Sequence, residues 1–399
     1  MISQGAKKAI YIGSLCSISY FAVYIARNIL GAVTPQMVEG GYSEEYIGRI
    51  SFVYLMTYAI GQLVNGAIGD RIKARWMICI GLFGGAATNF SFSLTASNES
   101  AAMILYGSTG FFLSMIYGSM TKLVSENTEP IYTARCSLGY TFASFFGSPA
   151  AGLLASLLAW QSVFAVSSSV LVIMATTVFI SFFLLERRGI IKYGQYKPEG
   201  QGKQGVGILF KHQIVKFSLV AMLTGVIRTS VVFWLPTYIA QHLSFQANEA
   251  TGIFSAATVF ISLSAFIAVF IYERLGRNMS ASLLLTFSLA TVFFALTYFV
   301  SFPIFNIIFI VLAITFSDGA ASILWSVYCP SLRDTGMVSS ATGFLDFLSY
   351  VAAAVANLLF GSAATSIGWE NLILVWTAIV AFGVIVALPY NKIRLKKQE

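Results

Sequence analysis

The chain has 399 residues, of which 57% are hydrophobic and only 10% are charged. Soluble domains carry about 25% charged residues, so this composition excludes a soluble globular protein. Long, nearly uncharged runs recur along the whole chain, and about 20 such residues in a helix cross a bilayer. Because backbone polar groups find no water inside lipid, each run should be helical. The expected fold class is therefore an all-α membrane protein.

We predict twelve transmembrane helices. In chain order they cover residues 9–37, 45–68, 76–96, 101–123, 131–157, 161–185, 214–240, 248–272, 279–300, 303–328, 337–366 and 370–390. The segment 187–212 is rich in Lys, Gly and Gln, which predicts a cytoplasmic linker between the sixth and seventh helices. The predicted domains are an N-terminal half, 1–186, and a C-terminal half, 213–399, with six helices each.

The basic residues indicate the orientation of these helices. If alternate loops are assigned to one side, starting with the N-terminus, all of the 24 Lys and Arg residues except Arg27, Arg49 and Arg228 fall on that side. The positive-inside rule then places both termini in the cytoplasm, in a chain embedded in the cell (inner) membrane. Topology thus accounts for the net charge of +8, and no nucleic-acid partner is expected.

Arg27 lies within the apolar stretch "YFAVYIARNILGAVTPQM", residues 20–37. A lone arginine at that depth costs about 2.5–3.5 kcal/mol on insertion scales, so a role must require it. A planar guanidinium offers a fork of donors that matches phosphate or carboxylate oxygens. We predict that Arg27 binds an anion, with buried interhelical pairing as the alternative.

Polar side chains share one face of each of the first two helices. Tyr20 and Tyr24 lie on the same side of the first helix as Arg27, because they precede it by seven and three residues. The second helix carries a similar stripe, formed by Tyr54, Tyr58, Gln62 and Asn65. Both stripes could serve substrate binding or helix packing.

The second half repeats features of the first. Arg27 is followed eight residues later by Pro35 in "RNILGAVTP", and Arg228 is followed eight residues later by Pro236 in "RTSVVFWLP". Parallel six-helix repeats build one large class of secondary transporters, with the substrate site near the midplane. We therefore expect two pseudo-symmetric halves, with both arginines facing one cavity.

A charged motif closes the second helix of each half, in "GAIGDRIKAR" (66–75) and "VFIYERLGR" (269–277). We predict a gate that latches the halves, although simple topology would also place charges there. The residues of this gating motif are Gly66, Asp70, Arg71 and Arg75, echoed by Glu273, Arg274 and Arg277.

These segments resemble the major facilitator superfamily and, more narrowly, the organophosphate:phosphate antiporter family, which includes the glycerol-3-phosphate and glucose-6-phosphate transporters. The matching pieces, between about residues 10 and 390, are "YFAVYIARNILGAVTP", "GQLVNGAIGDRIKARW", "KLVSENTEP", "RTSVVFWLPTYI" and "SATGFLDFLSYVAAA". The resemblance implies a major facilitator fold in which Arg27 and Arg228 clamp a phosphate group. It also implies that Tyr20, Tyr24 and Tyr58 contact the substrate.

The chain departs from that family at several positions. Gln62 stands where the glycerol-3-phosphate transporter has a lysine, and Ser144 about where it has a histidine that helps to bind phosphate. Phe233 and Thr258 replace two of its acids. The phosphate site would be less cationic, so exchange of inorganic phosphate does not follow automatically.

Asp318 and Asp346 are acidic residues within predicted spans. An ionised carboxylate is costly in lipid, so each should face the cavity, pair with an arginine or stay protonated. Three interpretations remain open: a role in substrate binding or proton coupling, structural pairing of charges, and exposure at a helix end.

The sequence thus predicts a secondary transporter rather than an enzyme, moving a small organic anion by alternating access. The most favoured substrate is a sugar- or glycerol-phosphate exchanged for phosphate or another anion. The alternative is a proton-coupled symporter or efflux transporter for an organic acid or drug. A non-transporting nutrient sensor is less favoured, since it would usually carry a large cytoplasmic extension.

The expected partners are a small anionic substrate and the lipid bilayer, with the chain acting as a monomer. Four scattered cysteines and two histidines predict no metal site, and no cofactor is expected.

Overall fold

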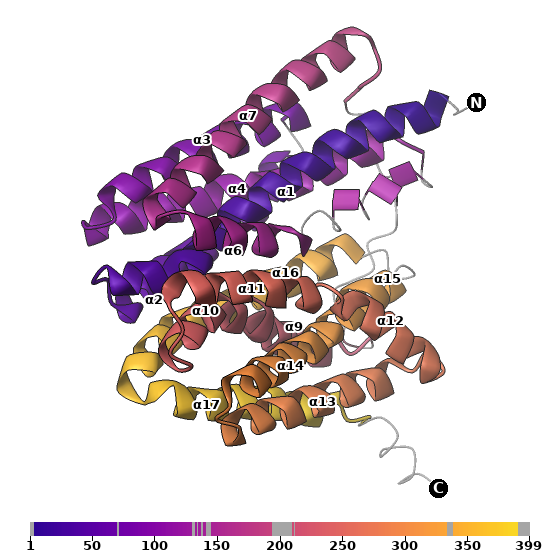
Figure 1. Cartoon of the computed structure of the whole chain (residues 1–399). Coiled ribbons are helices and arrows are strands. Elements are labelled where there is room, and N and C mark those ends of the chain that lie inside the picture. Colours follow the sequence, from indigo (N-terminus) through magenta and orange to yellow (C-terminus); the bar gives the residue numbers. More distant parts are fainter. Residues whose placement is uncertain are drawn as a thin grey trace, which may run out of the picture. The chain divides into compact units, whose positions relative to one another are not determined.

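The structure, a computed structural model, describes residues 4–69, 72–129, 132–133, 135–136, 139–140, 145–193, 210, 212–332 and 338–389. Within these residues the regular elements are helices and none is a strand (Figure 1). Among the described residues, eleven helices are long and apolar enough to cross a membrane. They correspond to eleven of the twelve predicted spans, and the fold class is confirmed. The remaining span, 131–157, is described in part and ends in α6 (Gly147–Leu157).

The chain forms two compact units. The first contains Met1–Gly200 and Phe245–Ala256, and the second contains Gln201–Ser244 and Ala257–Glu399. The segment 245–256 lies with the first unit, where the backbone N–H of Ala247 donates to Glu39 Oε1 at 3.2 Å. The sequence pattern had assigned this segment to the second half.

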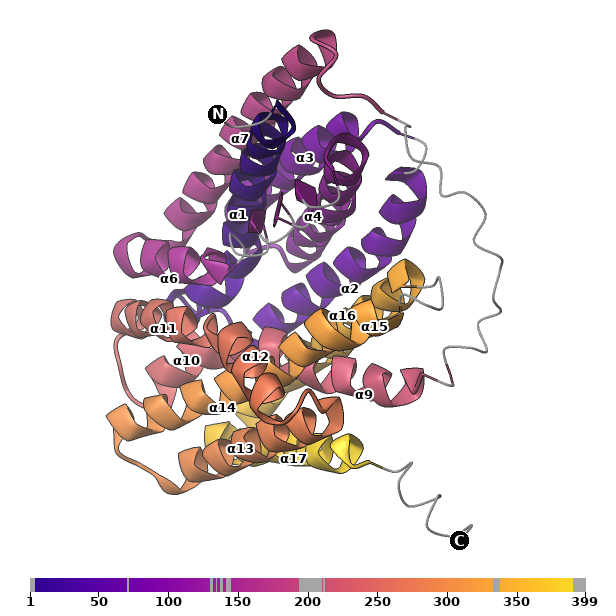
Figure 2. The same ribbon diagram turned by 90° about the vertical axis from the view of Figure 1, so that its right-hand side faces the viewer.

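The first unit is a bundle of long helices (Figure 2). Its helices are α1 (Gln4–Glu39), α2 (Glu44–Gly69), α3 (Ala74–Thr95), α4 (Glu99–Asn127), α6 and α7 (Trp160–Arg187). Helix α4 packs against α2 and α3, whereas α7 packs against α3 and α1. Trp160 is the first residue of α7.

Two glycines let these helices approach closely. A Cβ on Gly147 would lie 2.9 Å from the backbone carbon of Tyr24, and one on Gly110 would collide with the carbonyl oxygen of Tyr54. Small residues at such crossings allow backbones to pack directly in membrane bundles. The backbones of α1 and α2 at Tyr24 and Tyr54 are therefore fixed by α6 and α4.

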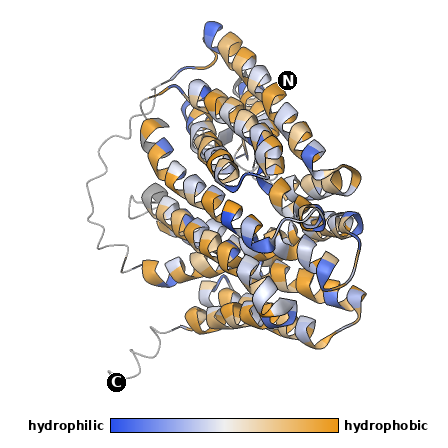
Figure 3. Cartoon of the chain, turned by 90° about the vertical axis from the view of Figure 1, so that its left-hand side faces the viewer, coloured by the Kyte–Doolittle hydropathy of each residue, from blue (hydrophilic) through white to orange (hydrophobic). Residues whose placement is uncertain are grey.

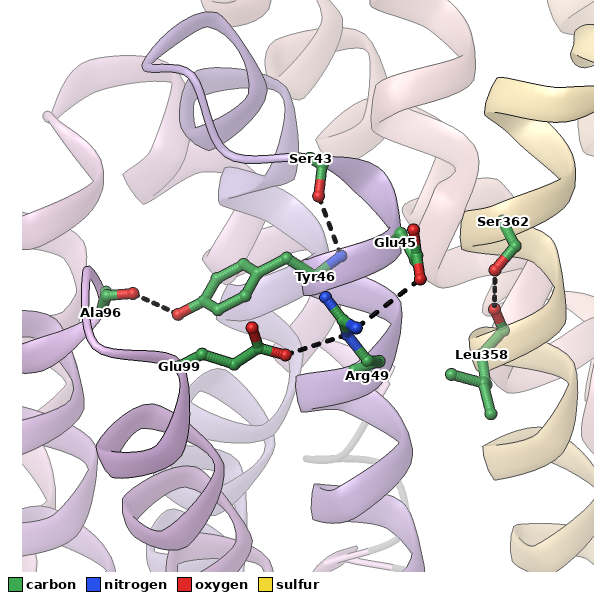
Figure 4. A network of polar contacts seen from close by, with 8 residues as sticks. All are labelled: Ser43, Glu45, Tyr46, Arg49, Ala96, Glu99, Leu358 and Ser362. Carbon is green, nitrogen blue, oxygen red and sulfur yellow. Dashed lines mark hydrogen bonds and ion pairs between the residues drawn. The ribbon is translucent and has the colours of Figure 1, made fainter.

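A polar cluster fastens the beginning of α2 to the connection between α3 and α4 (Figure 4). Arg49 Nε lies 3.1 Å from Glu99 Oε1, and Arg49 Nη1 lies 3.6 Å from Glu45 Oε1. The Tyr46 hydroxyl donates to the carbonyl oxygen of Ala96. Arg49 is thus an ion-paired residue at a helix end.

A second ionic cluster lies at the other end of the first unit. Arg75 is only 7% exposed, and its Nη1 lies 2.7 Å from Glu186 Oε2. Glu186 Oε1 binds Lys73 Nζ at 2.6 Å. Burial, together with the charge of Glu186, raises the pKa of Tyr193 beside them to about 12. One carboxylate therefore joins the beginning of α3 to the end of α7.

The second unit contains the remaining helices. They are α9 (Ile214–Gly225), η1 (Val226–Val231), α10 (Val232–Gln241), the later part of α11 (Ala247–Ile261), α12 (Ser264–Arg274), α13 (Met279–Phe299), α14 (Pro303–Ile323), η2 (Leu324–Tyr328), α15 (Cys329–Ser331), α16 (Val338–Ser366) and α17 (Gly368–Ala387). Helix α13 packs against α14 and α17, and α16 packs against α9 and η1. Trp369 lies in the first turn of α17, and its indole donates to Gln241 Oε1 at 2.7 Å.

Three irregularities of the second unit were not predicted from the sequence. The elements η1 and η2 are turns of π-helix, and the eighth span is interrupted between α11 and α12. Such π-turns within α-helices are frequent at functional sites. One of them, η1, contains Arg228.

Residues of hydrophobic type recur along the helices of both units (Figure 3). Many large ones are exposed, including Leu94 and Ile104 at 69% and Phe299 at 77%. Exposed apolar surface of this extent on long helices is what a lipid environment requires. The chain is a multi-pass membrane protein.

We predict that Glu186→Gln destabilises the protein. Removing one partner of a fully buried pair costs about 3–5 kcal/mol, and because the Glu186 side chain is 24% exposed we expect a loss of about 2 kcal/mol. Thermal unfolding of the purified protein in detergent measures it. The control is Glu45→Gln, whose pair with Arg49 is exposed and should contribute under about 0.5 kcal/mol. Equal effects of the two changes would contradict a structural role for the Glu186 cluster.

Candidate functional site

The candidate site of the first unit is centred on Arg27 of α1. Its guanidinium carbon lies 5.2 Å from the ring centroid of Tyr24 and 5.1 Å from that of Tyr58 on α2. Attraction between a guanidinium and an aromatic face is worth about 0.5–2 kcal/mol, more as water is excluded. Two rings from two helices thus hold the cation, and the structure brings together three residues that the sequence nominated.

Further tyrosines extend this arrangement. The ring centroid of Tyr20 lies 4.9 Å from that of Tyr24, 5.4 Å from that of Tyr117 and 6.1 Å from that of Tyr140. Tyr117 and Tyr140 were not predicted from the sequence, although each is a tyrosine within an apolar run. The hydroxyl groups of such a cluster can donate to and accept from an oxygen-rich ligand.

The remaining polar residues of the α2 stripe are buried or half-buried. Tyr54 is 3% exposed and its ring packs 4.8 Å from that of Tyr106, centroid to centroid. Asn65 donates to Ser114 Oγ at 2.8 Å, which ties α2 to α4. Gln62, which lies between Tyr54 and Asn65 in the sequence, is half-buried. Ser144 lies outside the described residues.

The candidate site of the second unit is centred on Arg228, in η1. Arg228 Nε lies 3.5 Å from Asp318 Oδ1 of α14, with side-chain exposures of 43% and 12%. Ser264, the first residue of α12, donates its hydroxyl to Asp318 Oδ2 at 2.5 Å. The interruption before α12 thus places a donor on the carboxylate. Ser264 had no signal in the sequence.

Asp318 and Asp346 occupy different surroundings. Asp318 pairs with Arg228, one of the arrangements that the sequence left open. Asp346 is half-buried in α16, near the turn α15 that follows the tenth span. Burial and, less strongly, the charge of Asp346 raise the pKa of Cys329 in that turn.

The predicted gating motif is only partly described. Gly66 lies in α2, whereas Asp70 and Arg71 lie outside the described residues. Arg75 belongs to the Glu186 cluster, and its ionic contact with Glu186 is internal to the first unit. A latch between the halves would require Arg75 to exchange this partner.

The corresponding motif of the second unit spans the end of α12 and the turn that follows it. Glu273 and Arg274 are the last two residues of α12, and the Arg274 guanidinium carbon lies 5.2 Å from the ring centroid of Phe270. Arg277 has a φ of 61°, in the left-handed region that disfavours most side chains. The turn after α12 is held by backbone hydrogen bonds, in which the N–H of Gly276 donates to the Glu273 carbonyl at 3.1 Å and that of Arg277 to the Tyr272 carbonyl at 2.8 Å.

The part of the chain that the structure describes holds no group of three or more His, Cys, Asp and Glu side chains arranged to bind a metal. Its four cysteines are buried and free. The groups that the two candidate sites offer are the guanidinium groups of two arginines, the hydroxyl groups of tyrosines and the Asp318 carboxylate, which is paired with Arg228.

Comparison with known proteins gives consistent likenesses. A family model described as the Major Facilitator Superfamily matches residues 16–357. The membrane sensor protein UhpC of Escherichia coli (strain K12) is 21% identical over 410 residues, covering 94% of this chain and 90% of that protein. A putative glycerol-3-phosphate transporter 2 of Arabidopsis thaliana is 30% identical over 81 residues, covering 18% of this chain and 16% of its own.

Solved structures share the fold. A bacterial homologue of the human lysosomal transporter Spinster, inward-facing and unoccupied, has a TM-score of 0.79 at 12% identity. The match covers 96% of this chain and 97% of that one. The expected major facilitator fold is confirmed.

We predict that Asp318 and Arg228 are energetically coupled. Asp318→Asn should cost about 1–3 kcal/mol, because it leaves a charged donor beside a neutral amide. Adding Arg228→Gln should then cost little more, whereas independent residues would give additive losses. A double-mutant cycle of thermal unfolding measures the coupling, with Ser264→Ala as a milder change at the same carboxylate. Additive effects of Asp318→Asn and Arg228→Gln would refute the pairing.

Proposed function

The chain belongs to the Major Facilitator Superfamily, and from that membership we propose that this transporter exchanges a small organophosphate for phosphate or another anion. It would do so by alternating access. Sugar- or glycerol-phosphates are the proposed substrate class. The short stretch shared with a protein named as a putative glycerol-3-phosphate transporter supports this class.

The observation that carries the proposal is the pair of arginines in spans Gly5–Glu39 and Ile214–Gln241. Each guanidinium is costly in a hydrocarbon layer, and each is positioned by residues of neighbouring helices. Aromatic rings engage the face of a guanidinium, whereas a phosphate is bound along its edge by parallel N–H donors. We propose that Arg27 and Arg228 bind the same anion.

The tyrosines would supply the second part of recognition. Tyr24 and Tyr58 position Arg27, and Tyr20 belongs to the same ring cluster. Their hydroxyls would hydrogen-bond the substrate. Gln62 and Ser144 remain proposed contacts of the substrate.

A second candidate function is favoured by the contact between Arg228 and Asp318. An incoming anion that binds Arg228 competes with this carboxylate. Asp318, 12% exposed, would then lose a charge partner, and protonation would lower the cost of its burial. That sequence of events would couple uptake of an organic acid or drug to protons instead of to anion exchange.

We also propose an orientation in the membrane and an oligomeric state for this transporter. The distribution of Lys and Arg over the loops supports cytoplasmic termini in a cell (inner) membrane. We propose a monomeric carrier, with Gly66, Asp70, Arg71 and Arg75 and the echo at Glu273, Arg274 and Arg277 contributing to gating.

We predict that phosphate-loaded liposomes containing the purified protein take up labelled phosphate and phosphate esters. Each lost charge-assisted contact is worth about 1.5–3 kcal/mol, so Arg27→Ala and Arg228→Ala should lower substrate affinity by about tenfold to a hundredfold. The matched control is Arg49→Ala, an arginine of the Glu45 and Glu99 cluster, which should retain exchange.

The same assay separates the rival functions. Uptake of a carboxylate or drug on external acidification, with no movement of phosphate compounds, would establish the proton-coupled candidate and reject organophosphate exchange. Binding of a phosphate ester without any flux would indicate a sensor, the role that the name of the Escherichia coli relative gives to that protein.

We predict that the ring of Tyr24 matters more than its hydroxyl. Tyr24→Phe keeps an aromatic face beside Arg27 and should weaken binding only a few-fold, whereas Tyr24→Leu removes a contact worth about 1–2 kcal/mol. Titration calorimetry with a phosphate ester measures both affinities. If Phe and Leu weaken binding equally, the hydroxyl binds the substrate and the ring does not act through Arg27.

A further inference from the structure

A groove of about 490 Å³ lies on the first unit between α3, α4 and α7. Its walls are formed by Trp76, Cys79, Ile80, Phe83, Phe112 and Phe179. Trp76, Ile80 and Phe83 are 43–46% exposed, so the groove opens at the lipid-facing surface. Its size is within the usual range of ligand pockets, about 300–1,000 Å³.

The shape of the groove depends on a missing side chain. A Cβ on Gly84 would lie only 2.6 Å from Phe112 Cγ. The ring of Phe112 therefore lies directly over the backbone of α3, and the space beside it stays open. A larger residue at position 84 would push this ring into the groove.

The length of the groove along α3 is close to the thickness of the hydrocarbon layer of one leaflet. Its lining on α3 begins at Trp76 in the first turn and ends at Gly84. Eight residues of α-helix rise about 12 Å, and half of a hydrocarbon core is about 15 Å. An acyl chain that enters the groove at Trp76, near the start of α3, would therefore fill the groove without leaving its leaflet.

Basic side chains gather at the same end. Arg187 and Arg188 are exposed at the end of α7, and the Lys73 side chain is 51% exposed. Together with Arg75, these described residues at the ends of α3 and α7 give four positive charges around the carboxylate of Glu186.

Stacked rings connect these charges to the groove. The Arg187 guanidinium carbon lies 4.6 Å from the ring centroid of Phe183, whose ring is stacked on Phe179 of the groove wall. The Arg75 guanidinium carbon lies 5.1 Å from the ring centroid of Trp76, on the opposite wall. The basic end and the apolar groove therefore form one continuous surface.

We propose that this surface binds an anionic glycerophospholipid. One acyl chain occupies the groove, and the phosphate is held by Lys73 and Arg187. An apolar channel that ends in excess positive charge suits a lipid of this class better than a neutral or zwitterionic one. Because Lys73 also binds Glu186, the lipid phosphate competes with the carboxylate that joins α3 to α7.

The test uses the full-length protein in phosphatidylcholine vesicles that contain brominated phosphatidylglycerol or brominated phosphatidylcholine. Bromine quenches nearby tryptophan fluorescence, and Trp76→Phe identifies the contribution of Trp76 among the six tryptophans. Each basic side chain near the phosphate contributes about a fivefold preference. We expect phosphatidylglycerol to be preferred at Trp76 by at least that factor.

Two pairs of variants complete the test. Lys73→Gln with Arg187→Gln should abolish the preference, and Arg49→Gln, at the opposite end of the unit, should leave it unchanged. Gly84→Leu should reduce quenching of Trp76 by both lipids, whereas Gly118→Leu, where a Cβ meets nothing within 4 Å, should not.

Either of two results overturns the proposal. One is equal quenching by the two lipids in the unmodified protein, and the other is a preference that survives loss of both basic side chains. The basic variants alter exposed or half-exposed side chains, so they decide the matter even if Gly84→Leu does not fold.

Discussion

The cost of keeping a guanidinium in a low-dielectric layer governs the organisation of both units. Arg27 sits beside two tyrosine rings, and Arg228 beside a carboxylate that itself accepts from a serine. These are two different physical solutions to one problem. In the first, aromatic rings lie beside the guanidinium, whereas in the second a carboxylate lies beside it. An anionic substrate would therefore meet a competitor at Arg228, and the charge carried by the empty transporter depends on that carboxylate.

The ionic clusters at the ends of the first unit serve the bundle instead. Arg49 and Arg75 both pair with carboxylates of other helices. Arg75 is nevertheless deeply buried, and its face is covered by aromatic rings of α3 and α7. Rigid attachment of α3 to α7 gives the lipid-facing groove between them a fixed shape. Architecture and lipid recognition thus depend on the same carboxylate, Glu186.

Much of the fold followed from composition, because a helix that crosses lipid needs only a long apolar run. Arg27 was found for the same reason, as a charge in such a run. The contacts of Ser264 and Tyr117 were not found. They depend on how neighbouring helices are rotated, and 54 residues separate Ser264 from Asp318. No local pattern carries that information.

The π-turn at Arg228 has a consequence for the symmetry of the chain. In both repeats the arginine precedes a proline by eight residues. In α1 an unbroken α-helix connects them, so each residue turns the side-chain direction by about 100°. In the second unit η1 intervenes, and its wider turn advances the chain by a smaller angle per residue. Although the spacing in the sequence is equal, the angle around the helix axis between arginine and proline differs in the two repeats. The two arginine side chains therefore point in directions that are not equivalent relative to their prolines.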